Sequence, residues 1–158
     1  MTRASLRTLM AVVAVVLFHG FAAGQEVPFK GAWAGKTVSA EPTDDPGVLF
    51  ITTAGKGHAT HLGKFSMVSP HYAELATGNV VGKQIFTAAN GDTLFANIVG
   101  QFTPTPDGLL TAQIQGTITG GTGRFENARG HYIFSIVFNP ATLESQARID
   151  GVISRHCH

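Results

Sequence analysis

The chain has 158 residues, and its 11 Lys and Arg nearly balance its 10 Asp and Glu. Recognition of nucleic acid needs clustered positive charge, so this composition argues against nucleic-acid binding. The only cysteine, Cys157, stands next to the C-terminus, which excludes a framework of internal disulfides.

Residues 1–24 have the pattern of a secretory signal peptide. Two arginines precede an apolar run from Leu9 to Phe18, and small residues follow it. The run is shorter than the roughly 20 residues that a membrane-spanning helix needs, although a retained membrane anchor is the alternative. We expect cleavage after Gly24 and export to the periplasm or the extracellular space, with no membrane attachment afterwards. The remaining residues, 25–158, suffice for one domain with its own core.

Alternation of apolar and polar residues predicts an all-β fold along the rest of the chain. Leu110, Ala112 and Ile114, for example, share one face of a strand whose other face carries threonine and glutamine. The polar segment 39–46 contains two prolines and is expected to be a surface loop. We expect eight strands, at residues 29–38, 47–54, 57–69, 79–89, 93–103, 109–119, 130–138 and 145–154.

The turn signals and the glycines favour a closed sheet. Asn90-Gly91 is typical of a type I′ turn, so the fourth and fifth predicted strands should pair directly. Glycine normally weakens a strand, but it permits the bulges and bends that a tightly coiled sheet needs. Eight strands can close around packed side chains or one small ligand. The glycines found within the predicted strands are Gly31, Gly35, Gly63, Gly82, Gly100, Gly116 and Gly151. The predicted fold is therefore an eight-stranded antiparallel closed β-barrel.

Residues 120–130, GGTGRFENARG, form the most specific local pattern. It indicates a glycine-rich corner, then a turn of helix with Phe125 and Ala128 on one side, then a glycine before the next strand. Such a turn can close one barrel mouth with Phe125 as the plug. An anion-binding loop is the alternative, but the Lys-Ser/Thr pair of a P-loop is missing. Glu126 is the only acid in the pattern, and it is either a general acid at the mouth or a solvated residue.

This run resembles the GGTGxFxxARG stretch of plant dirigent proteins and the corresponding stretch of allene oxide cyclases. The upstream runs GHATHLGKF and ANGDTL are similar to those of exported bacterial proteins of the same barrel superfamily. The resemblance implies a barrel with an apolar lumen, often trimeric, that steers the coupling or cyclisation of a hydrophobic small molecule. The catalytic acids and arginines of dirigent proteins find no match here, so the fold transfers and the activity does not.

Gly31-Ala32-Trp33 also resembles the Gly-x-Trp start of lipocalins, which belong to another group of eight-stranded ligand-binding barrels, the calycins. Trp33 is accordingly either a ligand contact or a large core residue that closes one end of the barrel.

Two histidines are the first candidates for a polar site. His58 and His61 stand three residues apart, so on one strand they would point to opposite faces and could share a metal ion only across a bulge. We expect neither a metal nor another cofactor. His61 is in phase with Phe65 and Met67, which predicts a place in the lumen. There it would be a general acid or base, or an ordinary core histidine.

Three functions stay open. The leading one is the binding of a hydrophobic small molecule, or a partner, at the lumen or rim through Trp33, His61, Phe65 and Phe125. The second is a cofactor-free cyclase or isomerase in which His61 or Glu126 acts as acid or base. The third is a structural or interaction barrel with a filled interior. The volume and polarity of the interior distinguish them.

Overall fold

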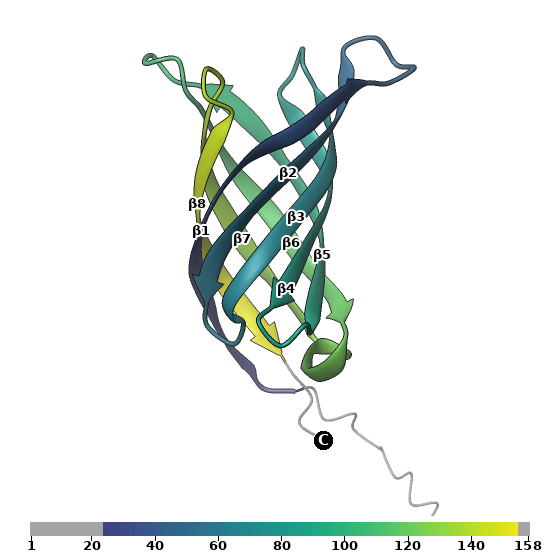
Figure 1. Cartoon of the computed structure of the whole chain (residues 1–158), viewed down its shortest axis with the longest axis vertical. Helices are drawn as coiled ribbons and strands as arrows, with labels where there is room; N and C mark the ends of the chain where they lie inside the picture. Colours follow the sequence, from purple (N-terminus) through teal and green to yellow (C-terminus); the bar gives the residue numbers. More distant parts are fainter. Residues whose placement is uncertain (1–23, 155–158) are drawn as a thin grey trace, which may run out of the picture.

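The computed structural model describes residues 24–154, and these form one closed antiparallel barrel (Figure 1). The predicted signal peptide up to residue 23, and Cys157, lie outside the described residues. Each strand pairs with its neighbours in chain order, and β8 returns to β1, which confirms the predicted fold class. The elements are β1 (Glu26–Pro42), β2 (Val48–Ala59), β3 (Gly63–Glu74), β4 (Asn79–Ala88), β5 (Thr93–Pro104), β6 (Leu110–Gly121), the short 3-10 helix η1 (Gly123–Phe125), β7 (Arg129–Asn139) and β8 (Glu144–Ser154).

The turns alternate between two ends of the barrel, which we call the closed end and the open end (Figure 1). The closed end carries the turns 60–62 and 89–92 and the helix η1. β1 extends to Pro42, so it takes up part of the loop predicted at 39–46. The open end carries the loops 43–47, 75–78, 105–109 and 140–143.

The turn between β2 and β3 corrects one predicted strand. The sequence predicted a strand over 57–69, whereas the chain turns at residues 60–62. His61 lies in this turn with a φ of 68°, in the left-handed region. Thr60 anchors the turn, because its hydroxyl donates to the carbonyl of Pro28 on β1 at 2.9 Å. The predicted placement of His61 within a strand is therefore wrong.

The turn between β4 and β5 confirms one prediction and corrects another. The two strands pair directly, with Thr87 opposite Thr93. The turn is not type I′, because only Gly91 of the Asn90-Gly91 pair has a positive φ (90°). The N–H of Gly91 donates to the carbonyl of Ala88 at 2.9 Å, the pattern of a type I turn followed by a left-handed glycine.

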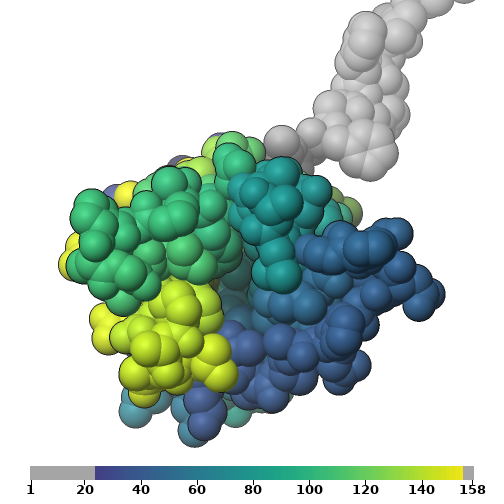
Figure 2. All heavy atoms as spheres, turned by 90° about the horizontal axis from the view of Figure 1, so that it is seen from above, coloured from purple at the N-terminus to yellow at the C-terminus, as the bar shows by residue number. Residues whose placement is uncertain are grey.

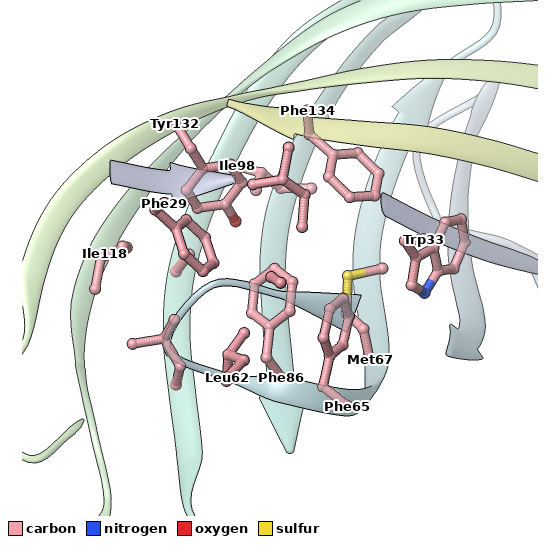
Figure 3. Packing of buried hydrophobic residues seen from close by; sticks show 14 of the residues in the cluster. Phe29, Trp33, Leu62, Phe65, Met67, Phe86, Ile98, Ile118, Tyr132 and Phe134 are labelled. Atoms are coloured by element: carbon pink, nitrogen blue, oxygen red, sulfur yellow. The ribbon is translucent and has the colours of Figure 1, made fainter. Parts of the chain in front are cut away.

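An aromatic core fills the half of the barrel next to the closed end (Figure 3). Phe86 stands at its centre and meets Phe29, Phe65 and Tyr132 edge to face, at centroid distances of 6.3, 5.3 and 6.0 Å. Edge-to-face contacts bring the positive ring edge onto the negative face of the next ring. Phe125 on η1 is fully buried, as predicted for a residue that plugs this end.

Glycines beneath aromatic rings allow this packing. A Cβ atom on Gly116 would overlap the ring of Tyr132, and one on Gly35 would overlap the ring of Trp33. The two register shifts of the barrel lie between Thr37 and Ser39 in β1 and next to Phe95 in β5, and neither is at Gly35 or Gly116. These glycines provide space for rings, rather than the bulges that the sequence analysis expected of them.

Candidate functional site

The half of the barrel next to the open end is hollow. It holds a cavity of about 480 Å³, which lies within the range of small-molecule sites. Figure 2, which looks onto the open end, shows the surface hollowed between the loops. A purely structural barrel would be filled along its whole length, and this interior is not. Large apolar side chains form most of the wall, among them Trp33, Leu49, Ile51, Met67, Val80, Ile98, Phe102, Leu110, Ile114, Phe134, Ile136 and Phe138.

Ser69, His71 and Gln84 place polar atoms on this apolar wall, and we call them the polar cluster. Ser69 and His71 alternate with outward residues on β3, and Gln84 is an inward residue of β4. The Ser69 hydroxyl donates to the Lys83 carbonyl at 2.9 Å. Buried polar groups are costly unless they are hydrogen-bonded, so this bond helps to hold Ser69 in place on the wall.

Tyr132 connects the polar cluster to the aromatic core. Its hydroxyl donates to Gln84 Oε1 at 2.5 Å. Burial raises the pKa of the Tyr132 phenol well above its usual value, so the hydroxyl keeps its proton and remains a donor. With Oε1 engaged, the amide nitrogen of Gln84 is the group that this side chain can offer to a guest.

His71 is the histidine that lies inside the barrel. Its Nδ1 is 3.0 Å from the carbonyl oxygen of Ser69. Burial lowers the pKa of His71, and the hydrogen bond to Ser69 opposes that shift in part. His71 faces Gly82 on β4, where a Cβ would come within 2.5 Å of His71 Cβ, so the glycine allows the two strands this close approach.

Trp33 forms part of the cavity wall. It lies at one side of the buried cluster, next to Met67 (Figure 3). Its ring packs against Phe134 at a centroid distance of 5.7 Å. Among residues 24–154, the indole nitrogen of Trp33 is the one buried side-chain nitrogen or oxygen without a hydrogen-bond partner. An unpartnered buried donor costs about 1–3 kcal/mol. The chain tolerates that cost beside the cavity.

The structure brings only one of the predicted site residues to the cavity, and that is Trp33. Phe65 and Phe125 belong to the core at the closed end. His61 lies in the turn at that same end, and Glu126 follows η1 and is exposed. The predicted lumen position of His61 is therefore wrong.

The sequence analysis missed the polar cluster, although its signal was present. The alternation that starts at Phe65 and Met67 continues inward through Ser69 and His71, but the predicted strand ended at residue 69. Gln84 stands two residues before Phe86, in phase with it on β4.

Within residues 24–154, no group of three or more His, Cys, Asp or Glu side chains could hold a metal ion. In the same range, no helix is long and apolar enough to cross a membrane. No family model, curated protein or solved structure matches the chain. The resemblance to the allene oxide cyclase and dirigent superfamily therefore rests on its three short sequence runs.

Acidification should destabilise the protein through His71. The pKa of His71 is lowered in the folded state, so below about pH 6.5 the unfolded chain takes up this proton first. The contribution to stability is complete above that pH and is lost as the pH falls through the folded-state pKa. We expect the urea midpoint to fall more between pH 7.5 and pH 5 in the wild type than in His71→Gln. His131→Gln, at an exposed histidine, is the control and should behave as the wild type does. An equal fall in His71→Gln would contradict this prediction.

Proposed function

We propose that the protein binds a small, largely apolar molecule in the cavity of its open half. The observation that carries this proposal is a hydrogen-bonded polar cluster on the wall of a cavity that is lined mostly by apolar side chains. Ligand sites in proteins have this composition, because apolar walls supply affinity and a few fixed polar groups orient the guest. Tyr132 and Ser69 hold the cluster through their hydrogen bonds before any guest arrives.

The two ends of the barrel support the same proposal. The aromatic core gives the cavity a packed floor, so a guest would enter through the open end. Leu75 and Leu143 on the loops of the open end line the cavity and are 64% and 46% exposed. Exposed apolar residues around an opening are a common feature of ligand-binding grooves.

Trp33 makes this proposal directly testable, because it is the only tryptophan of the chain and it lies in the cavity wall. N-phenyl-1-naphthylamine is a neutral apolar fluorophore that absorbs where tryptophan emits. We expect it to bind one molecule per chain and to quench Trp33 by energy transfer.

Narrowing the cavity should weaken this binding. Ala73 lines the cavity on β3, and Ala73→Phe would place a ring inside it. We expect a roughly five- to 150-fold loss of affinity for the fluorophore, since forcing a guest against an extra ring costs about 1–3 kcal/mol. Ala34→Phe, on the exposed face of β1, is the matched control and should bind as the wild type does. The proposed function would be contradicted if the wild type does not bind the fluorophore, or if both variants bind it equally well.

A second candidate is a cofactor-free isomerase or cyclase of the allene oxide cyclase or dirigent kind. His71 favours it, because a neutral imidazole on an apolar wall can take a proton from a bound substrate. The distinguishing result is a bound molecule that leaves with unchanged mass and altered chromatographic retention, a conversion that His71→Gln abolishes. For either function, the leader predicted over residues 1–24 would place this domain outside the cytoplasm.

A further inference from the structure

The ring of His71 is held in one tautomer by its own strand. Nδ1 lies 3.0 Å from the Ser69 carbonyl oxygen, and a carbonyl oxygen can only accept a hydrogen bond. Nδ1 therefore carries the proton. A neutral imidazole has one N–H, so Nε2 keeps a lone pair and is an acceptor. Burial lowers the pKa of His71, which keeps the ring neutral near pH 7.

The acceptor Nε2 belongs to the cavity side of the ring. Nδ1 is directed at the backbone of β3, which leaves Nε2 at the far end of a side chain that lines the cavity. The residues opposite His71 on the neighbouring strands are Ile51 on β2 and Gly82 on β4, and neither is charged. Neither of these two neighbours therefore competes as a charged partner for Nε2.

Few charges face this acceptor. Besides His71, the only titratable residue among 24–154 that lines the cavity is Glu74, which is exposed near the open end and accepts from the Thr77 hydroxyl at 2.6 Å. Lys83 belongs to the exposed face of β4. No lysine or arginine of the described chain lines the cavity. An anionic guest would therefore find no cation among the described wall residues.

We infer that the cavity selects neutral guests that carry a hydrogen-bond donor, such as an alcohol or an amide N–H, over carboxylates and over molecules without a donor. This inference rests on the proposed ligand-binding function. An alcohol donates to His71 Nε2 and can accept in return from the Gln84 amide nitrogen. A carboxylate meets the Nε2 lone pair without a compensating charge, and an unpaired buried charge is strongly unfavourable. It would bind only together with a proton on His71, which burial opposes.

Three decyl compounds test this inference by calorimetric titration at pH 8: 1-decanol, decyl methyl ether and decanoate. The ether keeps the oxygen and replaces the hydroxyl hydrogen with a methyl group, so it cannot donate. Because one net hydrogen bond is worth about 0.5–1.5 kcal/mol, we expect the alcohol to bind roughly three- to tenfold more tightly than the ether. Decanoate should bind most weakly. His71→Phe should bring the ratio of alcohol to ether affinity to about one, whereas the exposed control His131→Phe should preserve it.

The outcomes separate this inference from the function on which it rests. Equal wild-type affinities for the alcohol and the ether, or decanoate as the tightest guest, overturn the inference and leave a ligand-binding barrel. If none of the three compounds binds, the proposed function itself fails. Should His71→Phe not fold, His71→Leu replaces it, because leucine likewise lacks the Nε2 acceptor. This variant should also bring the ratio of alcohol to ether affinity to about one, and an unchanged ratio would overturn the inference.

Discussion

Truncation of Phe86 to alanine is expected to lower the free energy of unfolding by about 3–5 kcal/mol, as for other large-to-small changes at packed aromatic residues. Phe86 is fully buried and contacts Phe29, Phe65 and Tyr132, all edge to face. These three rings come from three different strands of a closed sheet, so the wall cannot collapse onto the vacated space. The cost should therefore lie in the upper part of the range for a phenylalanine.

Urea unfolding followed by Trp33 emission measures this effect, with Phe95→Ala as the matched control. Phe95 is a phenylalanine on the outer face of β5 and is 38% exposed. Its truncation should cost less than about 1 kcal/mol, as most surface substitutions do. Similar midpoints for the two variants would show that the aromatic core is not what stabilises the barrel.

The barrel could be predicted from the sequence because its strands show the alternation of a sheet with one wet face. In β6 the inward Ala112 and Ile114 alternate with the outward Gln113 and Gln115, and no helical spacing competes with this pattern. The corner at residues 120–130 gave a second local signal, since its pattern predicted a short turn with Phe125 as a plug, and Phe125 is buried.

The error on His61 has a different cause, because the end of the strand before it depends on a turn that is fixed by a distant contact. His61 and Phe65 have the same parity, and only the turn at 60–62 separates them. Thr60 stabilises that turn by bonding to Pro28 and Lys30, about thirty residues earlier in the chain. The residues around the turn at 60–62 do not by themselves indicate such a contact. The sequence analysis therefore assigned the lumen histidine to His61 and did not consider the inward His71.

The alternation of apolar and polar residues does not predict the cavity either. Alternation shows which residues face inward but not how far they fill the interior. Phe29 lies opposite Gly151 in the register with β8, and Phe65 lies opposite Gly57 in the register with β2. These pairings bring the large rings together at the closed end. In the open half many wall residues are equally large, but they leave a cavity of about 480 Å³ between them. Strand register, rather than composition, separates the core from the site.

Gly116→Val tests the link between core and site, and we expect it to destabilise the protein by about 2–3 kcal/mol through overpacking. Valine suits a strand, and the φ of Gly116 is not positive, so the backbone does not oppose the change. The new Cβ would instead overlap the ring of Tyr132. Moving that ring would also break the bond from its hydroxyl to Gln84 Oε1, which loosens the polar cluster.

Two further variants identify the cause of this destabilisation. Tyr132→Phe removes the hydroxyl and keeps the ring, so it should cost only about 1 kcal/mol, the net value of one hydrogen bond. In Gly116→Val/Tyr132→Ala the overlap is absent, so the double variant should be more stable than the sum of the two single effects predicts. If the changes in unfolding free energy of the two single variants simply add, the Tyr132 ring does not depend on the space that Gly116 leaves. A change at Gly116 would then not reach the polar cluster through Tyr132.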